Sequence, residues 1–249
     1  MIRLEDVYLA KAHKEILTGL TLEVTADERL VILGESGVGK STILKVILGL
    51  WKPDRGRVLL HGKDINRLPE SELIERRKTL AVVFQGGALF DSLTVGENVG
   101  YRLFEAGRLA PAAIEEIVRE KLAEVGLEEA IDLYPSQLSG GMRKRAAIAR
   151  ALAADPQLIL FDEPTAGLDP VASCRINELI VRCQDEGKGT VVVTHDLECA
   201  FRVGEQLMLL DNGRIVFQGD RSAMESSVLP AVRRFLHPEQ YVNDKGRQP

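Results

Sequence analysis

The chain lacks any apolar run approaching the roughly 18 to 20 residues that a membrane-spanning helix needs. Charged residues interrupt the first 20 positions throughout, so we expect no signal peptide. Cysteine is scarce: Cys174, Cys183 and Cys199 are odd in number and lack CxxC spacing. This pattern disfavours a disulfide framework and a zinc site, and predicts thiols that pack between helices in a reducing compartment.

An excess of positive charge is also absent, because the formal net charge is −5. A protein whose main task is to coat nucleic acid needs a basic surface, so nucleic acid is not an expected partner. Hydrophobic residues make up 45% of the 249 positions, which is enough to bury the core of one large domain or of a domain with a lobe. We expect a protein of the cytosol, or one held on a membrane through a partner.

The sequence does contain a phosphate-loop motif at residues 34–41, Gly-Glu-Ser-Gly-Val-Gly-Lys-Ser. An apolar run at 29–33 predicts a strand before it, and apolar spacing at 42–50 predicts a helix after it. Amides of such a loop and the positive end of the helix dipole converge on phosphate, while Lys40 reaches the β- and γ-phosphates and the Ser41 hydroxyl binds Mg²⁺. A chance Gly-rich turn is the alternative, which the flanking elements disfavour. The predicted nucleotide contacts are Gly34, Glu35, Ser36, Gly37, Val38, Gly39, Lys40, Ser41 and Thr42.

Two carboxylates end a second predicted strand, Leu158-Ile-Leu-Phe-Asp162-Glu163. Parallel sheets present ligand-binding groups at the carboxyl ends of their strands. Asp162 is therefore predicted to hold Mg²⁺ through its water shell, and Glu163 to align and deprotonate the attacking water. An acidic strand-to-loop junction on the surface is the simpler alternative, but the phosphate loop upstream favours the catalytic interpretation.

A third motif, Leu138-Ser139-Gly140-Gly141-Met142, begins a predicted helix. Ser139 is a natural N-cap, and the two glycines expose amides at the positive helix end, which makes a second anion site. One chain with one nucleotide has no evident use for two such sites. A two-fold, head-to-tail dimer would use both, because residues 139–141 of each chain could close on the γ-phosphate held by the other. An ordinary Gly-rich helix cap is the alternative.

The order of elements predicts an α/β fold: a phosphate-loop NTPase core with a parallel sheet, an antiparallel β subdomain and an inserted helical lobe. Residues 1–222 form the predicted ATPase domain, with the lobe at about 86–155, and 223–249 form a C-terminal extension. The extension is expected to carry a short helix at 231–237 between Pro230 and Pro238, docked through Phe235 and Leu236 either on its own core or on the neighbouring subunit. A loose polar tail should follow from Tyr241, and a frayed terminus is the alternative for the whole segment. Predicted strands are 2–8, 20–24, 29–33, 57–60, 63–65, 80–84, 158–161, 190–194, 207–210 and 214–218, and predicted helices are 42–50, 111–125, 139–154 and 171–183.

These motifs, in this order and with Gln85, Ala166-Gly-Leu-Asp169 and His195, resemble those of the nucleotide-binding subunit of ABC transporters. The resemblance covers residues 2–219 and implies ATP hydrolysis with ATP and Mg²⁺. It implies that Gln85 senses Mg²⁺ and the membrane subunits, that Asp169 bridges the dimer, and that His195 contacts the γ-phosphate; standing alone, His195 would be a capping residue after a strand. The family stacks adenine on an aromatic residue. By register Leu9 stands there, and Tyr8, one residue earlier, is the predicted base contact.

Within this family, the segment from Gln85 to Thr94 and the late Val232-Arg-Arg-Phe-Leu236 resemble the ATPase of MCE-type (Mla) lipid transporters. The resemblance implies a homodimer, peripheral on the cytoplasmic face of the inner membrane. Its implied partners are two permease subunits and an MCE lipid-binding protein, and it allows a STAS-domain subunit. The alternatives are another ABC importer or exporter, a non-transport ABC protein, or a nucleotide switch, which would not need Glu163.

Overall fold

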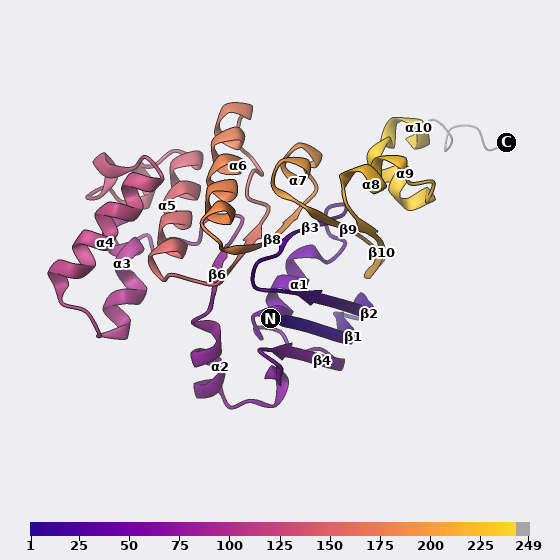
Figure 1. The fold of residues 1–249 in the computed structure, drawn as a ribbon, viewed down its shortest axis with the longest axis horizontal. Coiled ribbons are helices and arrows are strands. Elements are labelled where there is room, and N and C mark those ends of the chain that lie inside the picture. Colours follow the sequence, from indigo (N-terminus) through magenta and orange to yellow (C-terminus); the bar gives the residue numbers. More distant parts are fainter. Residues whose placement is uncertain (243–249) are drawn as a thin grey trace. The chain divides into compact units, whose positions relative to one another are not determined.

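The computed structural model describes residues 1–242 and divides the chain into two compact units. The first unit comprises Met1–Leu73 and Val192–Pro249, and the second is Ile74–Val191. Two elements cross the boundaries between them, helix α2 (Glu70–Arg77) and strand β8 (Gly189–Thr194). Figure 1 follows the elements from the N-terminus to the C-terminus.

An antiparallel sheet forms one layer of the first unit, with strand order β2-β1-β4-β5. Strand β1 (Ile2–Lys11) pairs with β2 (Lys14–Val24) and with β4 (Arg55–Leu60), and β4 continues through a turn into β5 (Lys63–Asp64). His61 has a φ of +50° in that turn, a conformation that is uncommon for a residue with a side chain. The predicted antiparallel pair is confirmed, although β1 and β2 extend further, to a tight turn at residues 12–13.

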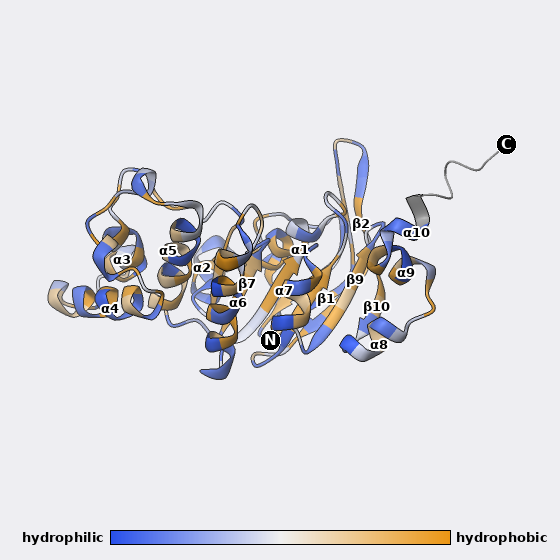
Figure 2. Ribbon diagram, turned by 90° about the horizontal axis from the view of Figure 1, so that it is seen from above, coloured by the Kyte–Doolittle hydropathy of each residue, from blue (hydrophilic) through white to orange (hydrophobic). Residues whose placement is uncertain are grey.

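A second set of strands in the first unit carries the phosphate loop. Strand β3 (Arg29–Leu33) runs parallel to β9 (Gln206–Asp211), which forms a hairpin with β10 (Arg214–Gly219) through a turn at Asn212-Gly213, a dipeptide typical of such hairpins. The side chains of residues 30–33 are fully buried, and the middle of β9, residues 207–210, is hydrophobic and buried (Figure 2). The helices of this unit are α1 (Lys40–Ile47), the 3₁₀ turn η1 (Ile65–Arg67), α7 (Leu197–Val203), α8 (Arg221–Ser226), α9 (Pro230–Leu236) and α10 (Pro238–Val242).

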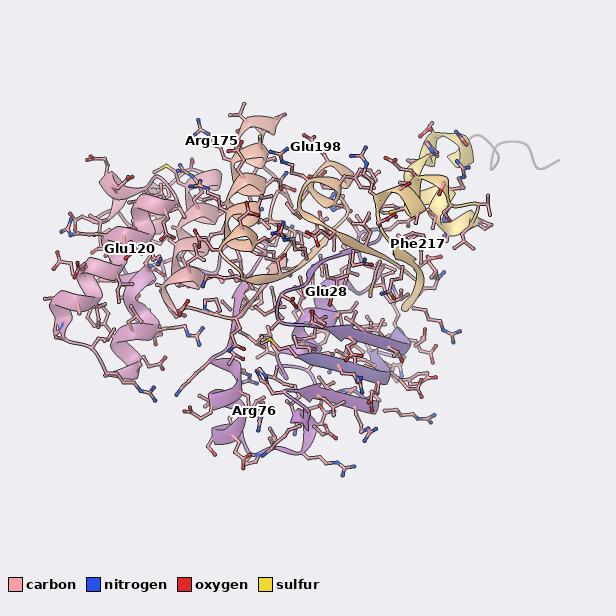
Figure 3. The ribbon with its side chains drawn as sticks, viewed as in Figure 1. Glu28, Arg76, Glu120, Arg175, Glu198 and Phe217 are labelled. Atoms are coloured by element: carbon pink, nitrogen blue, oxygen red, sulfur yellow. The ribbon has the colours of Figure 1, made fainter. Side chains whose placement is uncertain are left out.

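The second unit combines parallel strands with a helical lobe. Strand β6 (Leu80–Val83) pairs in parallel with β7 (Leu158–Asp162), whose first four side chains are fully buried. Its helices are α3 (Val95–Ala106), α4 (Pro111–Glu124), α5 (Gly140–Ala153) and α6 (Pro170–Asp185), with 3₁₀ turns η2 (Glu128–Ala130) and η3 (Pro135–Gln137). Helices α3, α4 and α5 pack on one another (Figure 1). Helix α6 buries Ile176 and Ile180, while Arg175 lies on its exposed face (Figure 3).

The three thiols differ in environment. Cys183 on α6 and Cys199 on α7 are buried, as predicted for thiols that pack between helices. Burial raises the pKa of the Cys183 thiol to about 12, so this group stays protonated and unreactive at neutral pH. Cys174 is exposed, so the packing prediction is wrong for this residue, which lies outside the buried stripe of α6.

The C-terminal extension carries the predicted helix, α9, followed by a further helix, α10. The predicted loose tail is wrong at Tyr241, which lies in α10, and residues 243–249 lie outside the described part. The predicted anchors are also different: Phe235 and Leu236 are half-buried, whereas Val232 is fully buried. An ion pair of 3.0 Å between Arg234 and Asp211, at the end of β9, holds the other side of the helix.

We expect Val232→Asp to release α9, because a buried carboxylate without a partner costs more than the helix gains by docking. Burial of a Val side chain stabilises by about 1.5 to 3 kcal/mol, so the free energy of unfolding should fall by about 2 kcal/mol. Hydrogen exchange should show the amides of α9 at random-coil rates. Val228→Asp is the matched control, since Val228 is 83% exposed. Protection of α9 in Val232→Asp equal to that in the control would contradict the docking.

Candidate functional site

The phosphate loop connects β3 to α1 within the first unit, as the sequence predicts. Gly39 is the N-cap of α1 with a φ of +114°, a conformation that L side chains rarely adopt. Gly34 faces the backbone of β9, where an added Cβ would stand 2.7 Å from the carbonyl oxygen of Leu210. Both glycines are therefore required by the backbone, which leaves the loop amides and the start of α1 available to an anion.

Lys40 is buried in the centre of this loop, with 5% of its surface exposed. Its Nζ donates hydrogen bonds to the carbonyl oxygens of Gly34, at 2.8 Å, and Glu35, at 3.0 Å. The ammonium is thus enclosed by the residues that would surround phosphate, and phosphate oxygens can replace these carbonyls as acceptors. Ser41 is half-buried and Thr42 is buried, in the first turn of α1.

The two residues considered for the base lie on opposite faces of β1. Leu9 is 2% exposed and belongs to the core, so its side chain is not available to a ligand. Tyr8 lies on the other face, with its hydroxyl oxygen near Gly19 of β2 and a half-buried ring. Lys11 shares the face of Leu9, since side chains alternate along a strand. Of these two residues, Tyr8 is the one outside the core, and its role as the base contact stays a prediction.

His195 follows β8 directly and is exposed, in the first unit. The next residue, Asp196, is the N-cap of α7 and accepts hydrogen bonds from the amides of Glu198, at 2.9 Å, and Cys199, at 3.2 Å. The amide of Asp196 donates to the Thr194 hydroxyl at 3.0 Å. The capping role that was the simpler alternative for His195 therefore belongs to its neighbour, which leaves the imidazole on the surface.

Asp162 and Glu163 close β7 in the second unit, and each is only 8% exposed. Glu163 has a φ of +47°, which is uncommon for a residue with a side chain. Residues held in sparsely populated backbone regions tend to occur where the surrounding structure constrains them for a function. The two successive carboxylates thus meet the geometric requirement of the prediction: both lie at the carboxyl end of a buried strand.

Lys144 constrains the backbone at this point. It lies on α5 and is 7% exposed, and its Nζ donates to the carbonyl oxygens of Glu163, Pro164 and Ala166 at 3.0, 2.7 and 2.9 Å. One ammonium therefore gathers three carbonyls of the loop that follows β7. The sequence analysis missed this residue. The signal available in the sequence was a charged residue on the face of α5 that also carries Ala147, Ile148 and Ala151, which are buried in the core.

We expect Lys144→Met to lower the rate of ATP hydrolysis because it retains the apolar stem and removes all three donors. Displacement of a catalytic group by about 1 Å can cost up to 100-fold, so we expect kcat to fall by about 10- to 100-fold. ATP affinity should change little, since the phosphate loop belongs to the other unit. Lys121→Met on α4 removes the two ion pairs that Lys121 makes with Glu120 and Glu124, and it is the control. Wild-type kcat in Lys144→Met would show that this lysine does not position Glu163.

The predicted helix cap is present at Ser139, whose hydroxyl oxygen accepts a hydrogen bond of 3.3 Å from the amide of Met142. The side chain of Met142 takes no part in this cap, because its backbone amide is the donor. Ser139 is exposed, and nothing crowds Gly140 or Gly141 closely: their added Cβ atoms would meet neighbours at 3.7 and 3.4 Å. Asp169 caps α6 in the same manner, accepting from the amide of Ala172 at 2.9 Å.

Gln85 is exposed at the start of a loop that is held by hydrogen bonds from two helices, α5 and α3. Arg150 of α5 donates to the carbonyl oxygens of Gly87 and Ala88, at 2.9 and 2.7 Å. Asn98, fully buried on α3, accepts from the amide of Phe90 at 2.8 Å and donates to its carbonyl oxygen at 3.1 Å. Burial lowers the pKa of the Arg150 guanidinium without removing its charge at neutral pH.

The comparisons identify the family once this geometry is known. The family model described as ABC transporter matches residues 17–166, more than half of the chain. A bacterial ABC transporter cassette solved as a dimer superposes with a TM-score of 0.82 at 35% identity, over 88% of this chain and 98% of that one. A post-hydrolysis dimer of an ATP-binding cassette with bound ADP and Pi superposes with a TM-score of 0.81 at 34% identity, over 88% of this chain and 98% of that one.

The chain belongs to the ABC transporter family, and it binds and hydrolyses ATP. The predicted α/β fold of the ABC ATPases is confirmed. Among residues 1–242, no helix is both long and apolar enough to cross a membrane.

Curated relatives narrow the resemblance. The chain is 41% identical to the protein TRIGALACTOSYLDIACYLGLYCEROL 3, chloroplastic, of Arabidopsis thaliana, over 94% of this chain and 73% of that protein. It is 37% identical to the intermembrane phospholipid transport system ATP-binding protein MlaF of Escherichia coli K12, over 95% of this chain and 88% of MlaF. It is 42% identical to the "Probable ribonucleotide transport ATP-binding protein mkl" of Mycobacterium tuberculosis H37Rv, over 88% of this chain but 61% of mkl. The resemblance to the Mla group is confirmed.

Proposed function

We propose that this chain is the ATP-hydrolysing subunit of a transporter that moves phospholipids between membranes. The observation that carries the proposal is the match to MlaF, a phospholipid transport subunit, which extends over 95% of this chain and 88% of MlaF. A relative named for a glycolipid supports the same class of substrate. The mkl protein, named for ribonucleotide transport, provides the second candidate, and the chain spans only 61% of its length.

The proposed chemistry places the predicted residues around one nucleotide in a dimer of this chain, with Tyr8 at the base. Lys40 and the loop amides hold the phosphates, and Glu163 aligns and deprotonates the attacking water. Mg²⁺ prefers oxygen ligands and retains part of its water shell, so the hydroxyl of Ser41, the amide oxygen of Gln85 and the carboxylate of Asp162 suit it chemically. His195 contacts the γ-phosphate. The partner protomer contributes Ser139, Gly140, Gly141 and Asp169 to the same nucleotide.

The helical lobe offers a surface for the membrane subunits. Phe90, Tyr101, Phe104 and Leu109 are between 38% and 52% exposed, although each is a large hydrophobic residue. The rings of Phe90 and Tyr101 pack in a tilted arrangement at a centroid distance of 4.7 Å, and the guanidinium of Arg150 lies 6.0 Å from the centroid of the Phe90 ring. Because Arg150 also holds the loop that follows Gln85, a subunit bound here would be coupled mechanically to a residue proposed to bind Mg²⁺.

The proposed assembly is a homodimer of this chain, two permease subunits and an MCE lipid-binding protein, at the cytoplasmic face of the inner membrane, and it allows a STAS-domain subunit. Purification of the tagged chain from solubilised membranes should recover these subunits. The recovered complex in proteoliposomes should transfer a fluorescent phospholipid to acceptor vesicles only with ATP, and a complex built with Lys40→Ala should not. Uptake of a labelled ribonucleotide instead, without lipid transfer, would overturn the proposal in favour of the second candidate.

A further inference from the structure

The turn at Asn212-Gly213, between β9 and β10, approaches the phosphate loop through a single carbonyl oxygen, that of Ile16 on β2. A Cβ added at Gly39 of the loop would stand 3.2 Å from this oxygen, and a Cβ added at Gly213 would stand 2.6 Å from it. Real Cβ atoms do not approach a backbone oxygen as closely as 2.6 Å, so only glycine fits at position 213. The Ile16 carbonyl is therefore in close reach of both the phosphate loop and the turn.

The same hairpin also borders the other end of the phosphate loop. Gly34 faces the carbonyl oxygen of Leu210 on β9, which a Cβ added at Gly34 would approach to 2.7 Å. Strand β9 reaches this position because it is paired in parallel with β3, the strand that leads into the loop. Both ends of the loop thus rest on the hairpin, directly at Gly34 and through Ile16 at Gly39.

Thr18 joins β2 to the turn by several hydrogen bonds. Its amide donates to the carbonyl oxygen of Gly213 at 3.0 Å, and its hydroxyl donates to the carbonyl oxygen of Asn212 at 3.1 Å. In return, Nε of Arg214 donates to the carbonyl and hydroxyl oxygens of Thr18, at 2.9 and 3.1 Å. Ile16 lies two residues before Thr18 on the same strand, so its position depends on the position of the turn.

We propose that Gly213 and Thr18 are positioning residues of the ATP site, which fix the Ile16 carbonyl against the phosphate loop and thereby set the affinity for phosphate. The loop amides must converge on the anion, and a hydrogen bond weakens steeply as its geometry departs from linearity. Packed backbone transmits a displacement to its neighbours because it contains few voids. A shift of the Ile16 carbonyl therefore moves the amides that follow Gly39.

Gly213→Ala tests the proposal, and Gly62→Ala is its matched control. The two glycines have nearly the same backbone conformation, with φ of +75° and +72°, so both substitutions introduce a similar backbone strain. Among residues 1–242, no atom outside the immediate chain neighbours of Gly62 lies within 4 Å of a Cβ added there. The control therefore includes the strain but not the contact with Ile16.

Calorimetry on the full chain measures the binding of ATP and of inorganic tripolyphosphate, which carries phosphates but no base. Gly213→Ala should weaken both by about tenfold, equivalent to one hydrogen bond to a charged group, because both ligands bind through the loop. Gly62→Ala should bind both as wild type does. The stoichiometry of binding gives the folded fraction, so unfolded protein is not counted as lost affinity. Equal affinities in the two variants, or a loss for ATP alone, would overturn the proposal.

Thr18→Val tests the same contact without crowding, and it replaces Gly213→Ala if that variant does not fold. Loss of the hydroxyl that joins β2 to the turn should weaken the binding of both ligands by about threefold, and Thr18→Ser should restore it. The control is Thr21→Val, which removes from the same strand a hydroxyl that accepts from the amide of Asp6 at 3.2 Å. Equal affinities in Thr18→Val and Thr21→Val would show that the turn does not position the loop. This test concerns phosphate binding and is independent of the transported substrate.

Discussion

Glu163→Gln is expected to bind ATP with wild-type affinity and to hydrolyse it at least about 100-fold more slowly. The amide has the size and shape of the carboxylate, so the constrained backbone at position 163 need not move. The amide, however, cannot accept a proton from water. ATP should then accumulate on the protein and trap a dimer, because hydrolysis would no longer separate the protomers. Single-turnover hydrolysis and gel filtration with ATP measure the two effects.

The control is Glu198→Gln, which makes the same chemical change in an exposed side chain on α7 (Figure 3). This variant should hydrolyse ATP at the wild-type rate. Near wild-type turnover in Glu163→Gln would exclude Glu163 as the general base. Asp162, the other carboxylate at the end of β7, would then be the residue to test.

The parts of the site that depend on neighbouring residues in sequence were predictable. Strand β3, the phosphate loop and α1 form one continuous segment, and its glycines and apolar spacing are read directly. The cap at Ser139 depends on an amide three residues later, and the turn at Asn212-Gly213 on two adjacent residues. Each of these features depends on residues that lie only a few positions apart. The sequence alone therefore contains the information needed to predict it.

The contacts that hold the site in position were not predictable in the same way. Lys144 binds carbonyl oxygens 19 to 22 residues away, and Arg150 binds carbonyl oxygens 62 and 63 residues away. A carbonyl oxygen is common to every residue, so these bonds leave no pattern at the accepting position. Only the donor side could have been noticed, as a lysine within the buried stripe of α5.

The residue that contacts the base was hard to predict from the sequence for a different reason. Register alone pointed to Leu9, and the preference for an aromatic residue pointed to Tyr8, one position away. Alternation along β1 places these two side chains on opposite faces and makes Leu9 part of the core. The same alternation assigns Lys11 to the face of Leu9, which the sequence already contained.

The shared-site dimer makes the sharpest prediction for mixtures of inactive chains. Lys40→Ala should lose ATP affinity, because the charge at the centre of the phosphate loop is removed. Ser139→Arg should lose hydrolysis, because a bulky cation replaces the exposed cap that we place on the partner's γ-phosphate. A heterodimer of the two would retain one complete site, with Lys40 from one chain and Ser139 from the other. Equal mixing yields about half heterodimers, so activity should recover to about a quarter of wild type in the reassembled complex.

A chain carrying both substitutions distinguishes this model from hydrolysis within one chain. When the double variant is mixed with wild type, each site of the heterodimer contains one defect, from Lys40→Ala or from Ser139→Arg, so the heterodimer should be inactive. If each chain instead hydrolysed its own nucleotide, the wild-type half of that heterodimer would remain active, and the two single variants would never restore each other. ATPase assays on heterodimers isolated with two different tags measure both mixtures under the same conditions. Activity in the second mixture and none in the first would replace the shared site with two independent ones.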